Sequence, residues 1–558
     1  MTSTIFWPHD ERASGWCYGW TVPALCVAGV LSDISMQKAE SALATLDSFP
    51  DWTRRSQYCG TPVILGKCTF KGQHRREDPS LELNGALVNP TVIYYHRHAS
   101  SSLRFYSLEN TKPTAEVSAT EKARNAAFAQ SLQHDFSRRK RRKGGINNVV
   151  INQFNAAYTI NNLLKPKQSR RLPAELSKRL FDFMDLSLYL PQRFLSLIRL
   201  PPSLSYLKEF SSTIQQLDVR AKQADYLTHE VAPLRQHDLT AIFMYSARYT
   251  NFFNTVWLIL NDITIGVAFG SFLCENHVVL ARMMNHGIKV FLIDWVQWVL
   301  HWLDSWPAGL KLNTELSHFY AHSFSDLVVV WGHVLEYGAP YLPGLLFGLG
   351  VCSSSGMTAA IALFSDLLAL ITLHIYVCYF VSRILYARLL RTGGSLWRLF
   401  RGKRFNVLRN RTDNWEYDTD QLLFGTILFT LLAFLFPTVL AYYALFALLR
   451  LGVILVNAAL DTQLAFMNHF PLFALMLRAK DPWRLPGGIY FGVVETKSGG
   501  EPRLMVQNQP IPLSTIFDQY IRLWSRLAAH YNPLRLLWYV LRGERLVAIP
   551  REAMRSFI

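Results

Sequence analysis

Charged residues are scarce in this sequence. Asp, Glu, Lys and Arg make up 17% of the 558 residues, whereas an average soluble protein carries about 25%. Hydrophobic residues reach 50% and aromatic residues 13%, a balance that excludes an intrinsically disordered chain. The charge that is present is biased, because 57 basic and 40 acidic residues leave a net charge of +17. This excess indicates a partner that is either nucleic acid or anionic lipid, and the positions of the apolar residues decide between them.

Cysteine is scarce too. Seven residues in 558 exclude a scaffold built from disulfides. Four of them form two pairs with nine-residue spacing, Cys17 with Cys26 and Cys59 with Cys68. Structural zinc sites use closer pairs, typically Cys-x2–4-Cys, so we expect free buried thiols. The chain also lacks the Gly-x-Gly-x-x-Gly and P-loop patterns of phosphate-binding loops, and we predict no cofactor.

Long apolar stretches lie mainly in the second half, at residues 251–273, 325–351, 357–384 and 421–457. About 20 apolar residues in a helix cross the hydrocarbon core of a bilayer. The last stretch would exceed about 50 Å as one helix, and Pro437 divides it, so we predict a helical hairpin there. Segments of this kind in series predict a mainly α, multispan membrane bundle. The basic excess is then expected to face lipid headgroups, with no nucleic-acid partner.

The segment 290–303 reads VFLIDWVQWVLHWL and has two interpretations. Asp294, Gln297 and His301 share one face of a helix, and three Trp side chains occupy the neighbouring face. Trp beside a polar stripe is typical of a helix at the membrane interface. A span whose polar stripe faces other helices fits equally well, and both interpretations stay open. With this helix included, we predict about six spans.

Residues 1–112 are predicted to form a small mixed α/β domain in the cytosol. The apolar run at 21–31 is too short to span a membrane and predicts a buried strand or helix. It does not read as a signal peptide, because acidic residues precede it and a basic n-region does not. VIYYHR at 92–97 follows the turn residues Asn89 and Pro90 and predicts a strand.

Residues 113–173 are polar and predict a linker. They contain RRKRRK at 138–143, which we interpret either as an inert basic linker or as a cluster attracted to anionic lipid. Residues 174–250 are predicted to be a helical cytosolic and juxtamembrane region that leads to the first span.

The distribution of basic residues predicts the topology. Nine basic residues and no acidic residue lie between Arg383 and Arg411, and the positive-inside rule places such a segment in the cytosol. We therefore predict a transmembrane bundle at 251–459 with a cytosolic basic loop at 385–420. The C-terminal region at 460–558 is expected on the same side, so both termini are predicted to be cytosolic.

Asp418 and Asp420 form an Asp-x-Asp pair, which is a weak candidate for a metal site. Two carboxylates at this spacing could hold the divalent ion of a nucleotide-sugar diphosphate. They also directly precede the apolar stretch at 421, where acidic residues complement a helix N-terminus. We favour the second interpretation and predict no metal ion.

Asp262, Asp366 and His374 are ionisable residues in the interior of the predicted spans. An Asp at the centre of a bilayer costs about 2.5–3.5 kcal/mol, so these side chains must face protein or water. Asp366 and His374 are eight residues apart and share roughly one helix face, as a buried acid–base pair would require. Hydrogen bonds between helices that fix assembly are the interpretation we favour.

Four strings carry a resemblance to a known family. They are PAGLKLN at 307–313, DLLALITLHIY at 366–376, SLWRLFRGKRFNVLRNRTDNWEYDTDQLLFGTILFTLLAFLFPT at 395–438 and FALMLRAKDPWRLPGGIYF at 473–491. They closely resemble subunit Q of phosphatidylinositol N-acetylglucosaminyltransferase, the PIG-Q family. The resemblance extends from about residue 251 to residue 512.

The resemblance implies a place in glycosylphosphatidylinositol (GPI) anchor biosynthesis. The family belongs to the endoplasmic reticulum complex that transfers N-acetylglucosamine from UDP-GlcNAc to phosphatidylinositol, the first step of that pathway. A different subunit, A, carries the glycosyltransferase fold, and subunit Q is regarded as a non-catalytic component that holds the complex together. The family has no established catalytic residues, so the resemblance implies none here.

Within that role, the basic loop suits contact with a lipid headgroup or with a partner subunit. The candidate contact residues are Arg398, Arg401, Lys403 and Arg404. Ordinary topology-setting charge explains them equally well. Two other functions stay open: a membrane-embedded enzyme that modifies lipid in its own right, and a lipid or solute transporter.

Overall fold

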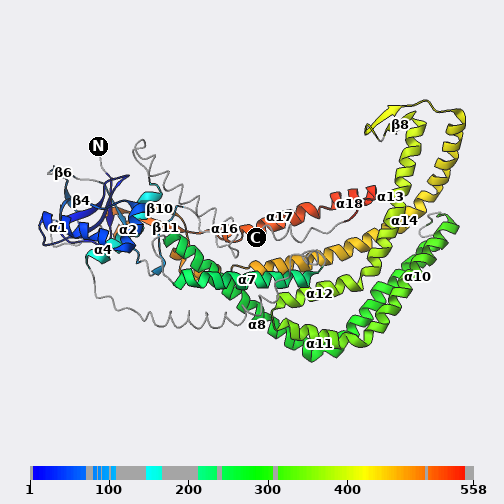
Figure 1. Ribbon diagram of the computed structural model, residues 1–558, viewed down its shortest axis with the longest axis horizontal. Coiled ribbons are helices and arrows are strands. Elements are labelled where there is room, and N and C mark those ends of the chain that lie inside the picture. Colours follow the sequence, from blue (N-terminus) through cyan, green and yellow to red (C-terminus); the bar gives the residue numbers. More distant parts are fainter. Residues whose placement is uncertain are drawn as a thin grey trace.

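The computed structural model describes residues 4–70, 79–83, 86–88, 91–99, 102–108, 146–165, 211–235, 242–305, 309, 312–406, 408–496 and 500–546. They form an elongated molecule with a β-sheet domain at one end, long helices along its length and a short β-hairpin at the far end (Figure 1). Most of the predicted linker, including the basic run at 138–143, lies outside the described residues.

A mixed sheet of nine strands organises the end domain in the part of the chain that the structure describes, in the order β10-β11-β7-β1-β3-β2-β4-β5-β6. The central neighbours β11, β7, β1 and β3 run parallel, and the other pairs are antiparallel. The strands are β1 (Thr4–Pro8), β2 (Gly15–Trp20), β3 (Leu25–Leu31), β4 (Val63–Thr69), β5 (Ser80–Leu83), β6 (Ala86–Val88), β7 (Thr91–Tyr95), β10 (Pro486–Thr496) and β11 (Gly500–Pro510).

The central strands are almost continuously apolar, as β1 (TIFWP) and β3 (LCVAGVL) show. Such runs suit strands that are covered on both faces. The ring of Phe154 lies at the centre of one covering layer, with centroids 4.6 Å from Tyr95 and 5.1 Å from Phe6. The helices of this domain are α1 (Met36–Ala44), α2 (Pro50–Cys59) and α4 (Asn148–Leu164).

The local expectations for the N-terminal strands and thiols are confirmed. The apolar run at 21–31 contains the buried strand β3, and VIYYHR contains β7. The four N-terminal cysteines are buried free thiols, as predicted.

The last two strands of the sheet come from the C-terminal part of the chain. β10 and β11 form an antiparallel hairpin, and β11 adds to β7 in parallel, with Leu504 opposite Ile93 and Met505 opposite Tyr94. The sequence patterns do not predict this pairing. It ties the two ends of the described chain into one domain across the intervening helices.

The helical part extends from this domain to the far hairpin. Helix α8 packs on α11, α9 on α10, α13 on α14, and α12 on both α7 and α14. The elements are α7 (Ser212–Arg235), α8 (Ile242–Gly287), a π-helix (Ile288–Asp294), α9 (Trp295–Asp304), α10 (Thr314–Gly338), α11 (Leu342–Ser353), α12 (Met357–Ile371), α13 (Leu373–Phe400), β8 (Lys403–Asn406), β9 (Arg411–Asn414), α14 (Thr419–His469), α15 (Leu472–Lys480), α16 (Leu513–Ile516), α17 (Asp518–His530) and α18 (Pro533–Arg542).

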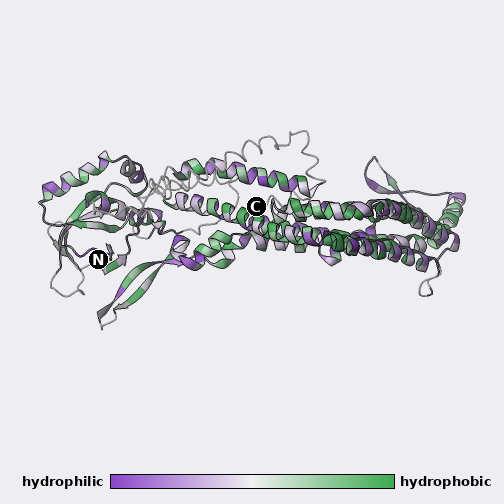
Figure 2. Ribbon diagram, turned by 90° about the horizontal axis from the view of Figure 1, so that it is seen from below, coloured by the Kyte–Doolittle hydropathy of each residue, from purple (hydrophilic) through white to green (hydrophobic). Residues whose placement is uncertain are grey.

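Three helical stretches among the described residues are long and apolar enough to cross a membrane: Tyr245–Asp304, Leu373–Phe400 and Thr419–His469. Met357–Ile371 is a shorter apolar helix. Hydrophobic residues recur along the whole helical part (Figure 2). The protein is therefore mainly helical with three candidate spans among the described residues. The predicted count of six spans is not confirmed.

The helical hairpin predicted at Pro437 is wrong. Helix α14 is 51 residues long and passes through Pro437 without ending. Proline removes one backbone donor and crowds the preceding turn, which bends a helix without having to end it. Apolar surroundings favour that outcome, because neighbouring groups can satisfy the freed carbonyl.

The segment 290–303 is likewise no separate helix, since the π-helix and α9 continue the stretch that begins in α8. Val296 and Leu300 are buried, whereas Trp298 is 61% exposed. Asp294 and His301 are exposed as well, so these members of the polar stripe do not face other helices of this chain.

Candidate functional site

A buried cluster of polar side chains joins four helices in the middle of the molecule. We call it the polar cluster and define it by Gln216 and Arg220 of α7, Asp262 of α8, Thr358 of α12 and Asn468 of α14.

Asp262 is the buried charge of the cluster, with 1% of its surface exposed. Its carboxylate forms an ion pair with Arg220 and accepts hydrogen bonds from the Thr358 backbone N–H at 3.0 Å and hydroxyl at 2.8 Å. Arg220 Nη2 also donates to Thr358 Oγ1 at 2.9 Å. A buried carboxylate is tolerated only when it is paired and hydrogen-bonded. Both Asp262 oxygens are engaged in this way.

Gln216 and Asn468 extend the cluster to α14. Their side-chain amides donate to each other's oxygens at 3.0 and 2.9 Å, and Gln216 Nε2 also donates to Thr358 Oγ1 at 2.9 Å. Each amide is at most 6% exposed. A reciprocal amide pair satisfies four polar atoms at once, so it fixes the register of α7 against α14.

Gly356 lets α12 begin directly over Asp262. Its φ is +143°, and a Cβ there would collide with Asp262 Oδ2 and lie 3.2 Å from Arg220 Nη2. The carboxylate therefore sits at the N-terminus of α12, where free N–H groups and the helix dipole favour negative charge. Gly266 and Gly270 similarly allow α8 to approach α11, because a Cβ on either would collide with backbone oxygens of Ser353 or Gly350.

Asp366 has a separate role at the start of α7. Its carboxylate accepts hydrogen bonds from Ser211 Oγ at 2.6 Å, from the Ser212 N–H at 2.8 Å, and from the Thr213 N–H and hydroxyl at 3.0 and 2.7 Å. These bonds satisfy donors that an α-helix leaves free at its N-terminus.

His374 is 2% exposed and is the second residue of α13, two residues after the break at Thr372. Its ring nitrogens lie 3.2 Å from the Ile371 carbonyl oxygen and 3.1 Å from the Leu292 carbonyl oxygen. The structure gives Asp366 and His374 different partners on different helices, because α12 ends between them.

The basic residues predicted as contacts gather at the far end of the molecule (Figure 1). Arg398 lies in the last turn of α13 with its guanidinium 5.5 Å from the Phe405 ring centroid. Arg404 of β8 lies 4.8 Å from the Trp415 ring centroid, and Arg401 is exposed between α13 and β8. We call residues 398–406 and 408–415 the basic hairpin. Cation–π contacts of this kind restrict the conformations of the two arginine side chains.

The two acidic residues of the Asp-x-Asp pair lie just beyond it. Asp418 is the residue before the first turn of α14, and Asp420 lies within that turn. Both are exposed, and they occupy the positions that complement a helix dipole.

A group with metal-ligand chemistry lies elsewhere, at the turn between α9 and α10. Potential ligand atoms of Asp304, His318 and His322 lie within 4.8 Å of one another. His318 Nδ1 lies 3.1 Å from Asp304 Oδ2, and His322 Nδ1 lies 2.9 Å from the His318 carbonyl oxygen. These contacts already engage one ring nitrogen of each histidine.

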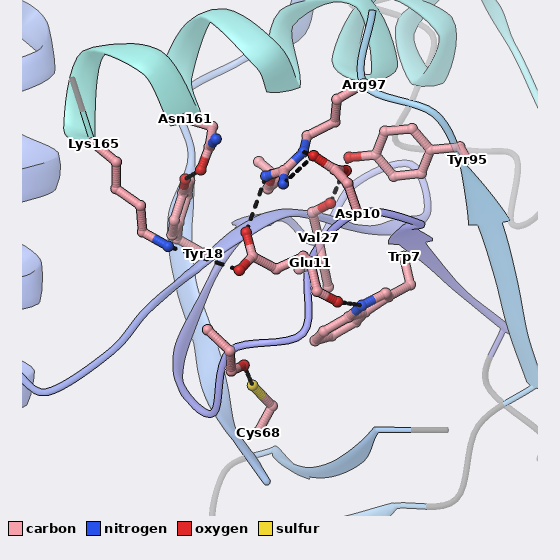
Figure 3. A network of polar contacts seen from close by, with 12 residues as sticks. Trp7, Asp10, Glu11, Tyr18, Val27, Cys68, Tyr95, Arg97, Asn161 and Lys165 are labelled. Carbon is pink, nitrogen blue, oxygen red and sulfur yellow. Dashed lines mark hydrogen bonds and ion pairs between the residues drawn. The ribbon is translucent and has the colours of Figure 1, made fainter. Parts of the chain in front are cut away.

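The sheet domain has its own polar network at the carboxyl ends of β1 and β7 (Figure 3). Arg97 binds Asp10 at 2.7 Å and Glu11 at 3.1 Å, and it donates to the Ala28 carbonyl oxygen at 3.0 Å. Lys165 of the segment after α4 lies 3.7 Å from Glu11. This network joins the ends of β1 and β7 to the middle of β3 and to the end of α4.

Three histidines flank that network, namely His9, His96 and His98. Burial lowers the pKa of each, that of His98 to about 4. The His9 and His96 ring centroids are 5.0 Å apart, and the His98 ring lies 5.2 Å from Tyr106. At neutral pH these rings are therefore neutral and pack as aromatic groups.

Sequence reasoning missed Gln216, Arg220, Thr358 and Asn468. The one available signal was the lone Asp262 in an apolar stretch, which requires a cationic or hydrogen-bonding partner but does not identify it.

Comparisons with known proteins match most of the chain. The model of the Gpi1 family, described as "N-acetylglucosaminyl transferase component (Gpi1)", matches residues 214–487. This range contains the whole polar cluster and the basic hairpin.

Several curated proteins are similar to this chain, and three of them are described here. The "N-acetylglucosaminyl-phosphatidylinositol biosynthetic protein gpi1" of Schizosaccharomyces pombe is 34% identical over 506 residues, which cover 84% of this chain and 77% of that protein. The "Phosphatidylinositol N-acetylglucosaminyltransferase subunit GPI1" of Saccharomyces cerevisiae is 34% identical over a region that covers 61% of this chain and 60% of the yeast protein. The "Phosphatidylinositol N-acetylglucosaminyltransferase subunit Q" of Mus musculus is 34% identical over a region that covers 57% of this chain and 53% of the mouse protein. No solved structure matches the chain.

Proposed function

The chain belongs to the Gpi1 family of N-acetylglucosaminyl transferase components, and from that premise we propose that it is a non-catalytic membrane subunit. The complex concerned transfers N-acetylglucosamine from UDP-GlcNAc to phosphatidylinositol, the first step of GPI-anchor biosynthesis. Relatives that are named as subunits of this transferase support the proposal. The catalytic subunit, A, is the proposed principal partner, with other subunits of the complex.

The complete engagement of the carboxylates of Asp262 and Asp366 is the observation that carries the non-catalytic role. Asp262 is fully committed to Arg220 and Thr358, and Asp366 accepts four hydrogen bonds at the start of α7. A general acid or base needs a lone pair or proton that can reach substrate. These carboxylates instead join helices, so they suit a scaffold that presents fixed surfaces to other subunits.

The basic hairpin is the proposed contact with phosphatidylinositol or with the cytosolic face of a partner subunit. Its cations Arg398, Arg401, Lys403 and Arg404 stand at the tip of two long helices. Two of them rest on aromatic rings, and a guanidinium held in this way presents its donors to phosphate with little loss of side-chain freedom.

The proposed location is the endoplasmic reticulum membrane, with both termini and the basic hairpin in the cytosol. Asn410-Arg411-Thr412 is the one acceptor sequon for N-linked glycans in the sequence, and Asn410 is exposed in the hairpin. We expect this site to carry no glycan. A glycosidase-sensitive band that disappears in Asn410→Gln would place the hairpin in the lumen and contradict the topology.

The experiment that tests the proposal is purification of the tagged full-length chain in mild detergent, followed by identification of the proteins that remain bound. We expect a glycosyltransferase subunit in the recovered complex. A protein recovered alone under conditions that preserve the transferase activity of the membranes would contradict an assembly role.

A further inference from the structure

Helices α17 and α18 form a consecutive pair that packs along the helical part with one face only. On α17, Leu523 and Leu527 are buried against Ala465 of α14, and Tyr520 Oη donates to the Phe466 carbonyl oxygen at 3.0 Å. These contacts fix how α17 is rotated about its own axis.

The second helix of the pair is fixed by tyrosines of the long helices. Tyr386 Oη donates to the Leu541 carbonyl oxygen and Tyr443 Oη to the Val540 carbonyl oxygen, each at 3.0 Å. The Leu546 N–H just beyond α18 donates to Tyr379 Oη at 2.9 Å. The pair is therefore docked on α13 and α14 as a structured part of the molecule.

A second apolar surface on this pair faces outward. Trp524 is 70% exposed and Leu534 is 75% exposed. Its remaining members are Ile521, Leu537, Trp538 and Leu541, each at least 50% exposed. Six large apolar side chains are therefore exposed on two short consecutive helices, and such a concentration of exposed apolar surface marks an interaction surface.

The positions of the arginines define an amphipathic surface. With about 100° of rotation per residue, Trp524 and Ile521 lie about 80° and 140° to one side of the centre of the buried stripe of Leu523 and Leu527. Arg526 and Arg522 lie about 80° and 120° to the other side. In α18 the same rotation places Leu537 and Leu541 about 100° and 140° to one side of the partly buried Leu536. Arg535 and Arg542 occupy its far flank, so the apolar and basic flanks of the two helices are arranged alike.

Side chains of α18 support its two cations, and Arg542 also lies 3.7 Å from the exposed Glu544 carboxylate just beyond the helix. Arg542 lies 4.4 Å from the Trp538 ring centroid, and Arg535 Nε donates to Tyr539 Oη at 2.9 Å. The two helices hold four arginines against the single acidic residue Asp518, which pairs with Arg522. An apolar flank bordered by cations and Trp is the composition of helices that lie in the headgroup region of a membrane.

We propose that α17 and α18 lie in the interface of an anionic bilayer. The flank of Trp524, Leu537 and Leu541 enters the acyl boundary, and the arginine flank contacts lipid phosphates. Four arginines exclude the hydrocarbon centre, and the six exposed apolar side chains disfavour bulk water. Attachment of the pair to two candidate spans, α13 and α14, holds it beside a bilayer. The proposed position of α17 and α18 in the membrane interface does not depend on the proposed function of the protein.

The test uses the full-length protein in nanodiscs of phosphatidylcholine and phosphatidylinositol. Spin labels are placed on the apolar flank by Leu537→Cys and on the arginine flank by Ala529→Cys, an exposed position next to Arg522 on the helix surface, as the matched control. The background carries Cys352→Ser and Cys274→Ser, because the other five thiols are buried. Collision with oxygen reports acyl chains, and collision with a water-soluble nickel chelate reports water.

We expect the Leu537→Cys label to collide more with oxygen than with nickel, and the Ala529→Cys label to show the reverse. A Leu537→Cys label that favours nickel would put the flank in water, and a label shielded from both reagents would mean that protein covers it. Either result overturns the proposal.

A second comparison tests the anionic lipid. Arg522→Gln with Arg535→Gln should shift the Leu537→Cys label toward water in discs with phosphatidylinositol and leave it unchanged in discs of phosphatidylcholine alone. An equal response in both lipids would overturn the role of the arginines in binding anionic headgroups.

Discussion

The sheet domain and the helical part place their apolar and polar residues in opposite ways. In the sheet domain, Trp7, Phe154 and Tyr95 are at most 1% exposed, and Asp10 reaches the surface. In the candidate spans only 28–33% of the most apolar window is buried inside the chain, whereas the polar cluster is almost wholly buried. The first arrangement suits water and the second suits lipid, where polar groups must find partners inside the protein.

Shortening a large apolar side chain should produce the largest difference in stability loss between the sheet domain and the helical part. We expect Phe154→Ala to destabilise the sheet domain by about 3–5 kcal/mol, because a fully buried aromatic ring leaves a cavity. Phe434→Ala in α14 is the matched control, since that ring is 76% exposed and should change stability by less than about 1 kcal/mol. Thermal unfolding of both variants in the same detergent checks the contrast, and equal losses would contradict it.

The ion pair between Arg220 and Asp262 tests how strongly the buried polar groups stabilise the helical part. Asp262→Ala should cost roughly 3–5 kcal/mol, because it leaves the Arg220 cation inside the protein without its counter-charge. The double variant Arg220→Met/Asp262→Leu should recover most of that loss. The melting temperature and yield of each purified variant measure the effect. A double variant no better than the single one would show that the pair is not the interaction being lost.

Acidification should weaken the sheet domain between about pH 6.5 and pH 4. Burial lowers the pKa of His98 from 6.5 to about 4, so over this range the unfolded chain binds a proton that the folded chain does not. Stability is therefore complete above pH 6.5 and falls as the pH drops, by up to about 3 kcal/mol. His98→Gln should flatten the pH dependence of urea unfolding, whereas His333→Gln, an exposed control, should not. Identical profiles for both variants would contradict the assignment to His98.

Charge reversal at the basic hairpin should have the smallest effect on folding. Arg401→Glu with Arg404→Glu changes exposed side chains, so we expect less than about 0.5 kcal/mol in stability. Recovery of partner subunits or use of phosphatidylinositol should fall. Unchanged recovery and unchanged transfer would remove the hairpin as a contact surface.

The sequence predicted the local features of both regions and missed their long-range contacts. Strand β3, strand β7 and the apolar stretches follow from composition and periodicity over a few residues. The pairing of β11 with β7 and of Arg220 with Asp262 joins segments far apart in the chain, and neither strand edges nor lone charges encode their partners. The hairpin predicted at Pro437 was wrong because proline marks a bend, and whether the helix ends there depends on tertiary surroundings.

The candidate site follows the same division. Asp262, Asp366 and His374 were singled out because ionisable groups in apolar stretches are costly. Their partners come from α7, the π-helix and α12, whose packing was not predictable from one sequence. The basic hairpin was identified as a charged segment, but the rings of Phe405 and Trp415 beneath its arginines appear only in the fold.

The measurement closest to the central claim is transfer of labelled N-acetylglucosamine from UDP-GlcNAc to phosphatidylinositol, with the purified chain alone and with the complete complex. We expect product only from the complex, and we expect Asp262→Ala to lower activity in proportion to the amount of complex recovered. Product formed by the chain alone would contradict the account and would make it an enzyme in its own right.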